Sequence, residues 1–405
     1  MTQADPAINP TNSNHLPPQY AVYQPDPVPD TLYRHWLFGE LYPWQEAAWQ
    51  YLTGQFGRLP HAMLFAGVAG IGKRAFVYRF VAWALCHNKP ADAHAPACGH
   101  CESCQWLIAQ THPNLYRVPA AAQPISTTPD EPSDTGTAKR RSKNAGAKTS
   151  ATTPKAKPDQ PTDLTIKVDD IRALQPFVQQ SSAGMRFVVI HHAEGMTLAA
   201  ANSLLKTLEE PAAQVLICLL CDQPASLLPT IRSRLQRVAI HHISAEQSLA
   251  TMRALIAQLP EAHPLKNRQT QELVQLNALS GYAPWQALAM LDSGWYDQRQ
   301  TWIVSWQALR SHKRSPIQAS DYWQKTLPLG DFLAMSQLLL TEIGNQISGL
   351  GLQQADLRWE RLQPIPTLAA ISDLHTIIHD IWQDKRQNVQ DKLCYDKLMT
   401  ALQQY

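Results

Sequence analysis

A glycine-rich stretch near residue 70, read as Gly-Val-Ala-Gly-Ile-Gly-Lys, contains the residue types that bind phosphate. It follows an apolar run at residues 62–66 and precedes a helical pattern. Glycines let successive backbone N–H groups face one anion, a helix N-terminus adds its positive dipole end, and a lysine reaches the terminal phosphates. We therefore predict a phosphate-binding loop; the alternative is a glycine turn that holds no phosphate. Its candidate residues are Gly67, Gly70, Gly72 and Lys73.

The residues that a nucleotide hydrolase needs for magnesium are replaced. A working loop continues with Ser or Thr, whose hydroxyl ligates Mg²⁺, but Arg74 stands there, and a cation cannot ligand a cation. The buried strand expected at 187–190 should end in Asp-Glu, but His191-His192 follows it, and neutral imidazoles supply no anionic charge. Neighbours on a strand point to opposite faces, so the two histidines are not expected to share zinc or copper. ATP binding should be weak or absent.

Four of the seven cysteines cluster between residues 86 and 104. They are Cys86, Cys98, Cys101 and Cys104, with His87, His94 and His100 as further candidate ligands. Four thiolates supply the tetrahedral ligand set of a structural Zn²⁺ site, and in a cytosolic protein such a pattern favours metal over disulfides. The alternative is a group of free core cysteines, which the turn-like Cys-Gly-His-Cys sequence disfavours.

Composition sets the frame for these sites. At 405 residues, two to four domains are expected, and 44% hydrophobic residues are enough for real cores. The net charge of +2 gives no global attraction to nucleic acid, so any such contact must be local. No run of 18 apolar residues and no signal pattern is present, so a soluble, cytoplasmic protein without membrane contact is expected.

Apolar runs and low-complexity stretches predict the organisation of the chain. Five short apolar runs alternate with helical patterns and predict an α/β domain with a largely parallel sheet. Residues 1–38 and 119–163 lack periodicity and are predicted to be a disordered arm and a disordered insertion. The basic later half of the insertion is either a plain solvated linker or a tether that touches DNA. A capping box at 244–247 opens a helical lid, and the remaining chain is helical.

Three features together resemble one family. The helix that ends Leu-Leu-Lys-Thr-Leu-Glu-Glu-Pro at 204–211, the turn Thr-Ile-Arg-Ser-Arg at 230–234 and the four-cysteine insert are similar to bacterial clamp loaders, the AAA+ proteins of the DNA polymerase III holoenzyme. The family's turn continues with Cys, where this chain has Leu235, an apolar replacement at a packing position. The replacements at Arg74 and His191-His192, with Pro284 where an active ATPase places a second sensing arginine, favour the non-hydrolysing delta-prime branch.

The resemblance implies a fold, a function and partners. It implies an AAA+ domain at 39–242 with a zinc module at 86–104, a lid at 243–295 and an all-α collar for oligomerisation at 296–405. The subunit would complete a loader ring that places the sliding clamp on primed DNA. Its partners would be the gamma/tau ATPase subunit, the delta subunit, the clamp and, through the complex, primer–template DNA. The competing function is an active ATPase with unusual residues.

The resemblance also assigns Arg234 a role. It would act in trans as an arginine finger on a neighbour's ATP, with Ser233 capping or orienting the turn. Two alternatives stay open: Arg234 only pairs with a local carboxylate, or Arg232 or Arg237 has the role instead.

Overall fold

The computed structural model describes residues 34–119 and 165–405, apart from gaps at 35, 90–91, 93–94, 120–164, 181–183, 211–212, 241–242, 260, 262, 293, 351–353, 355 and 387–388. Most of the predicted arm and nearly all of the predicted 119–163 insertion lie outside the described residues. The arm prediction is wrong for its last residues, because Trp36 and Leu37 are helical and buried. Trp36 stacks on Tyr78 of helix α3 (Lys73–Leu85), with ring centroids 5.5 Å apart.

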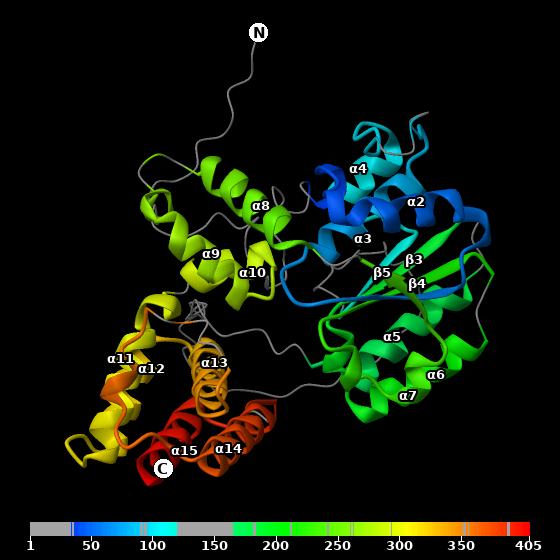
Figure 1. The fold of residues 1–405 in the computed structure, drawn as a ribbon. Coiled ribbons are helices and arrows are strands. Elements are labelled where there is room, and N and C mark those ends of the chain that lie inside the picture. The colour runs from blue at the N-terminus through cyan, green and yellow to red at the C-terminus, as the bar shows by residue number, and fades with distance from the viewer. Residues whose placement is uncertain are drawn as a thin grey trace, which may run out of the picture.

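Five parallel strands form one sheet in the order β2-β3-β4-β1-β5. The strands are β1 Ala62–Ala66, β2 Leu115–Val118, β3 Arg186–Ile190, β4 Val215–Cys221 and β5 Gln236–Ala239. The helices around the sheet are α2 Glu46–Gly54, α3 Lys73–Leu85, α4 Glu102–Ile108, α5 Val168–Gln179, α6 Leu198–Glu209 and α7 Pro229–Arg232. Helices α2–α4 cover one face of the sheet and α5–α7 the other (Figure 1).

The three central strands β3, β4 and β1 are buried along their whole length and almost continuously apolar, because both faces of the sheet are covered. In β4 every residue is buried, and alternate side chains enter different cores. Leu216 and Leu220 pack in the core with α2 and α3, whereas Ile217 and Leu219 pack in the core with α5 and α6. The predicted α/β class with a parallel sheet is confirmed.

The rest of the chain is helical. It contains α8 Ala245–Ala257, α9 Thr270–Leu279, α10 Pro284–Asp292, α11 Trp295–Arg310, α12 Pro316–Thr326, α13 Leu329–Ile347, α14 Leu368–Arg386 and α15 Asp391–Gln404. Helices α8–α10 lie beside the α/β body, and α11–α15 form a bundle below them in Figure 1. The predicted capping box is confirmed, since the Gln247 N–H donates to Ser244 Oγ at 3.1 Å. The predicted domain boundaries stay predictions.

One ion pair and one hydrogen bond between side chains join the α8–α10 group to the bundle. Arg268 lies before α9 and donates to both carboxylate oxygens of Asp297 in α11, at 2.9 and 2.5 Å. Gln275 of α9 donates to Asp356 at 2.5 Å, and the same carboxylate pairs with the buried Arg299 of α11 at 2.7 Å. These polar contacts add to an apolar core whose buried side chains come from both groups.

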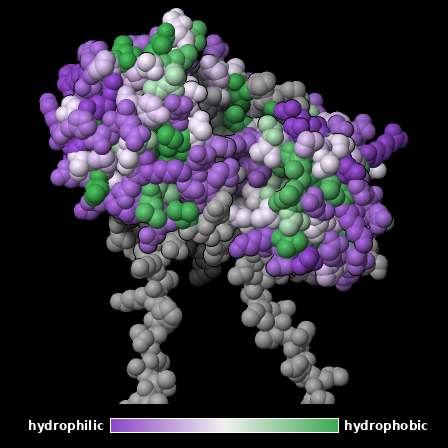
Figure 2. Space-filling view, turned by 90° about the horizontal axis from the view of Figure 1, so that it is seen from below, coloured by the Kyte–Doolittle hydropathy of each residue, from purple (hydrophilic) through white to green (hydrophobic). Residues whose placement is uncertain are grey.

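The visible surface is mixed in polarity. Figure 2 shows a largely hydrophilic face on both lobes, with hydrophobic side chains in separate patches. Among the described residues, no helix combines the length and the apolar character that crossing a membrane requires.

Candidate functional site

The glycine-rich loop connects the C-terminal end of β1 to the N-terminus of α3, as a phosphate-binding loop requires. Gly70 and Gly72 have φ values of +78° and +82°, a left-handed conformation that glycine adopts without strain. A Cβ at Gly70 would collide with the backbone of Gln286 in α10, so the loop is packed directly against that helix. The predicted loop architecture is present, but its outer side is covered by protein.

Lys73 is bound within the chain. Its ammonium group donates to the carbonyl oxygens of Gly67 and Val68, both at 2.7 Å, and lies 2.5 Å from Asp222 Oδ1. An ammonium group has three N–H donors, so all three are used by these contacts. The side chain is only 6% exposed. Lys73 is thus directed back into the protein instead of toward a phosphate above the loop.

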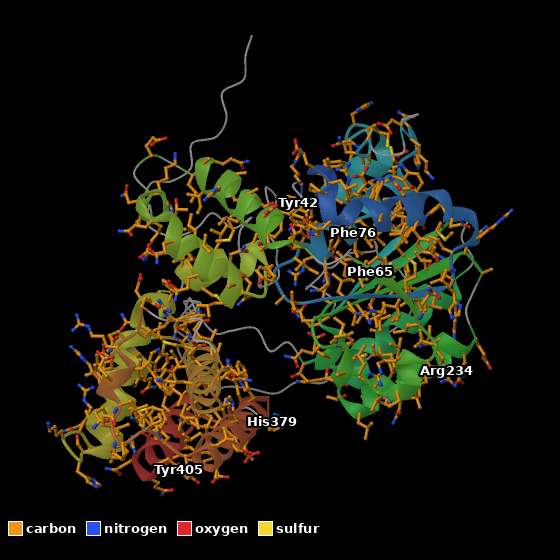
Figure 3. All side chains as sticks on the ribbon, viewed as in Figure 1. Tyr42, Phe65, Phe76, Arg234, His379 and Tyr405 are labelled. Atoms are coloured by element: carbon orange, nitrogen blue, oxygen red, sulfur yellow. The ribbon has the colours of Figure 1, made fainter. Side chains whose placement is uncertain are left out.

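Aromatic and amide side chains cover the loop from two elements. From the segment before α2, Trp44 donates its indole N–H to the Ile71 carbonyl at 3.2 Å, and Gln45 donates to the Gly72 carbonyl at 3.3 Å. From α10, the backbone N–H of Trp285 donates to the Gly70 carbonyl at 3.3 Å. The Trp44 and Trp285 rings meet edge to face, with centroids 6.3 Å apart. Figure 3 shows the neighbouring Tyr42 where the α8–α10 group meets the α/β body.

His191 and His192, at the end of β3, contact different partners. The Tyr78 hydroxyl lies 2.9 Å from His191 Nε2, and Arg74 Nη2 lies 3.1 Å from His192 Nε2. Burial, with the nearby Arg74 charge, lowers the pKa of His192 to about 4 and that of His191 well below its ordinary value. Both imidazoles are therefore neutral at pH 7, and His192 accepts a hydrogen bond from the Arg74 guanidinium.

Two cationic side chains already contact the groups that could bind a metal ion beside the loop. His192, Glu194 and Asp222 bring three possible ligand atoms within 4.8 Å of one another. Lys73 already pairs with Asp222, however, and Arg74 with His192. A divalent ion would have to displace or approach two fixed positive charges, which costs Coulomb energy. We do not assign a metal to this group.

Asp222 was missed by the sequence analysis. It directly follows β4, and the C-terminal ends of parallel strands β1, β3 and β4 meet at one edge of the sheet. A carboxylate just after a buried strand that adjoins β1 is the signal that predicts a partner for Lys73. Trp285 and Gln286 were missed as well, since only the tertiary packing of α10 brings them to the loop.

The four predicted cysteines come together at the far end of α3. Their sulfur atoms all lie within 4.8 Å of one another, and Cys86–Cys101 and Cys98–Cys104 are each 3.9 Å apart. A tetrahedral zinc with Zn–S bonds of about 2.3 Å needs sulfurs about 3.8 Å apart. No disulfide joins the cysteines of the described residues. The distances fit a closed Cys₄ site.

The surroundings of the cysteines also suit thiolate ligands. The Cys98 N–H donates to Cys86 Sγ at 3.4 Å, and the Cys101 N–H donates to Cys98 Sγ at 3.3 Å. Burial alone would raise the pKa of Cys101, but N–H groups of Cys104 and His87 and the neighbouring thiols hold it at about 6. Burial raises the pKa of Cys86 and Cys104, so a cation is needed to keep those two ionised.

Arg234 lies at the opposite edge of the sheet from the glycine loop. It follows α7 and precedes the first residue of β5 by two positions, whereas the loop follows the last residue of β1. Its Nη2 lies 2.6 Å from Glu209 Oε1, and its Nη1 donates to the Thr230 carbonyl at 2.9 Å. Figure 3 shows Arg234 on the outer side of the α/β body, away from the helical groups. The local carboxylate foreseen as an alternative is therefore present.

The turn around Arg234 is exposed. Ser233 Oγ donates to the Thr230 carbonyl at 3.0 Å, which caps the short helix α7. Arg232 and Arg237 are exposed too, so burial does not separate them from Arg234. Leu235 is partly buried against the core with α5 and α6, in keeping with a packing position.

Comparison with known proteins finds similarity to subunits of DNA polymerase III. Residues 44–244 match a family model described as DNA polymerase III, delta subunit. A DNA polymerase III subunit delta' of Pseudomonas aeruginosa is 32% identical over 293 residues, which cover 72% of this chain and 74% of that protein. A subunit delta' of Yersinia pestis is 34% identical over 195 residues, which cover 48% of this chain and 46% of that protein. A subunit gamma/tau of Mycobacterium tuberculosis is 28% identical over 208 residues, which cover 51% of this chain and 28% of that protein.

Proposed function

The chain belongs to the DNA polymerase III delta-prime family, and we propose that it is a non-hydrolysing subunit of the clamp loader. In this function it completes a ring of AAA+ subunits and helps to load the sliding clamp onto primed DNA. The gamma/tau ATPase subunit, the delta subunit and the clamp are its proposed partners, with DNA contacted through the assembly. The assembly works in the cytoplasm.

The proposal that this subunit does not hydrolyse ATP rests mainly on one observation. The Lys73 ammonium group is paired with Asp222 and two loop carbonyls. A hydrolase needs that lysine for the phosphates and needs carboxylates for magnesium and water. Here Arg74 binds a neutral histidine, and the neighbouring carboxylate faces a lysine. Trp44 and α10 also cover the loop. The arrangement supports a structural loop with weak or no ATP binding.

The position of Arg234 supports action on another subunit. Within this chain, the glycine loop and Arg234 lie at opposite edges of the sheet, separated by a strand of five residues, about 16 Å. An exposed arginine at the outer edge can reach a neighbour's nucleotide in a ring but not its own loop. Its guanidinium would stabilise charge on the transferred γ-phosphate, an effect of about 10³–10⁵ in rate for arginine fingers.

The cysteine cluster supports a structural metal. The four sulfurs leave no open position for substrate, and the cluster joins the end of α3 to α4, far from both the loop and Arg234. We assign it Zn²⁺, which would stabilise the module between residues 86 and 104 without a role in chemistry.

The test uses the isolated protein and the reconstituted complex. Alone, the protein should show neither ATP turnover nor tight binding of Mg²⁺-ATP. In the complex, Arg234→Ala should lower clamp- and DNA-stimulated ATP hydrolysis without loss of assembly. Arg237→Ala, an exposed arginine on β5, is the matched control. Unchanged hydrolysis with Arg234→Ala, or turnover by the isolated protein that Lys73→Ala abolishes, would contradict the proposal.

A further inference from the structure

Two elements hold the Arg234 guanidinium. Glu209, the last residue of α6, places Oε1 2.6 Å from Nη2, and the Thr230 carbonyl of α7 accepts from Nη1 at 2.9 Å. Ser233 Oγ lies 3.5 Å from Nη1, at the limit of a hydrogen bond. A guanidinium has five N–H donors, so the carboxylate and the carbonyl leave three for a phosphate. Arg234 is thus held in place while three of its N–H donors stay available to a phosphate.

The place of Glu209 on its helix is unfavourable for the helix itself. Glu209 and Glu210 stand at the C-terminus of α6, where the helix dipole is negative and carboxylates are destabilising. Only Lys206 adds a positive charge from within the last turn. The contact with Arg234 supplies the positive charge that this end of the helix lacks. Helix stability therefore does not explain the carboxylate, whereas its contact with Arg234 does.

The end of α6 is itself fixed to the sheet. His61, just before β1, places Nε2 2.8 Å from the Leu208 carbonyl, in the last turn of α6. Thr207 in the same turn accepts from Gln175 of α5 at 2.8 Å. Glu209 therefore extends from a rigid platform, while Arg234 lies on an exposed turn with a long side chain that has much rotamer freedom to lose.

We propose that Glu209 is a positioning residue for Arg234, an inference that rests on the proposed function of Arg234 in trans. Glu209 holds the guanidinium in one orientation before the neighbour's nucleotide arrives, so less conformational freedom is lost when the phosphate binds. A carboxylate in this place could instead repel the phosphate and restrain the finger. The two effects have opposite signs, because a positioning residue raises the neighbour's turnover and a restraint lowers it.

The experiment is the Glu209→Gln substitution in the complete loader. The glutamine keeps the size of the side chain and removes its charge. The kcat of clamp- and DNA-stimulated ATP hydrolysis should fall about threefold to fivefold, the range expected when a partly exposed pair is lost. The KM for ATP should not change, because the nucleotide is bound by the neighbouring subunit. Glu210→Gln, the adjacent exposed carboxylate at the same helix end, should match the wild type.

A double substitution separates positioning from a general structural effect. In an Arg234→Ala background, Glu209→Gln should cause no further loss of kcat, because there is no guanidinium left to hold. Glu209→Asp, which keeps the charge on a shorter chain, should restore part of the loss. Assembly and the unfolding temperature of Glu209→Gln should equal those of Glu210→Gln.

Three outcomes would overturn the inference: equal kcat for Glu209→Gln and Glu210→Gln, a kcat above wild type for Glu209→Gln, or an additive double substitution. If Arg234→Ala alone leaves hydrolysis unchanged, the proposed function of Arg234 fails. If Arg234→Ala abolishes stimulation but Glu209→Gln does not change it, only the positioning role fails.

Discussion

Lys73→Met tests whether the glycine loop has become a structural element. The Lys73 and Asp222 side chains are 6% and 17% exposed, with 2.5 Å between nitrogen and oxygen. Removing one partner of such a buried pair leaves the other charge poorly compensated, at a cost of about 3–5 kcal/mol. In a working ATPase the same change mainly removes phosphate binding. Here we expect a clear loss of stability in the absence of any nucleotide.

The assay is chemical unfolding of the purified full-length chain, followed by tryptophan fluorescence and circular dichroism. Adding Asp222→Asn to Lys73→Met should restore part of the stability, because the charge left behind is then removed as well. Lys397→Met is the matched control, since Lys397 pairs with Asp384 at 2.7 Å but is 42% exposed. An exposed pair contributes about 0–1 kcal/mol, so this control should unfold near the wild type.

Nucleotide provides the refuting result. A ligand that binds the folded state raises stability by RT ln(1 + [L]/Kd). Because the Lys73 ammonium is already paired within the chain, Mg²⁺-ATP should bind too weakly to change the unfolding midpoint of the wild type. A wild type protected by ATP, together with a Lys73→Met protein that keeps its midpoint but loses this protection, would show that the lysine serves phosphate. The reasoning from the Lys73–Asp222 pair would then be wrong.

The remaining predictions concern the metal, pH and the insertion. Elemental analysis should find about one zinc per chain. Cys101→Ser should release the zinc and lower the unfolding temperature, whereas Cys394→Ser, outside the cluster, should keep the metal. A wild type without zinc after gentle purification would refute the site. The pKa of His192 is about 4 in the fold against an ordinary 6.5, so the unfolded chain takes up the proton first and stability should fall by up to about 3 kcal/mol as pH drops from 6.5 to 4. His192→Asn, which also tolerates the left-handed φ of 49°, should reduce that pH dependence in unfolding curves. Deleting residues 122–160 should leave assembly intact in gel filtration, because the segment lacks apolar residues to bury; weaker DNA-dependent loading only at low salt would indicate phosphate contacts of its basic half.

Local patterns were sufficient for much of the fold and one site. The three central strands were predictable because a strand covered on both faces must be apolar throughout. The cysteines were predictable because two Cys-x-x-Cys steps place thiolates within reach of one another across a single turn. The capping box at Ser244 and Gln247 was predictable for the same reason, since all of its contacts lie within four residues.

Contacts between distant segments could not be predicted in this way. Lys73 and Asp222 are 149 residues apart in the sequence, and only the order of β1 and β4 in the sheet brings them together. Trp285 reaches the loop only because α10 packs on it. The Glu209–Arg234 pair requires that the end of α6 and the turn before β5 share one edge of the sheet. The local sequence marks Asp222 as a carboxylate at a strand end, but the order of the strands is needed to pair it with Lys73, and the local sequence gives no such signal for Trp285 or Glu209.

The glycine loop shows why a phosphate-binding sequence motif can be present in a chain that is not expected to hydrolyse ATP. Gly70 and Gly72 adopt left-handed φ values, and α10 lies where a side chain on Gly70 would be. Gly72 is the N-cap of α3 and lies against Gln45 and Trp285. Both glycines are therefore required by backbone conformation and by packing, with no nucleotide involved. A working site is distinguished by the residues that contact magnesium and phosphate. In this chain the residues at those positions bind other side chains: Arg74 binds His192, and Lys73 binds Asp222.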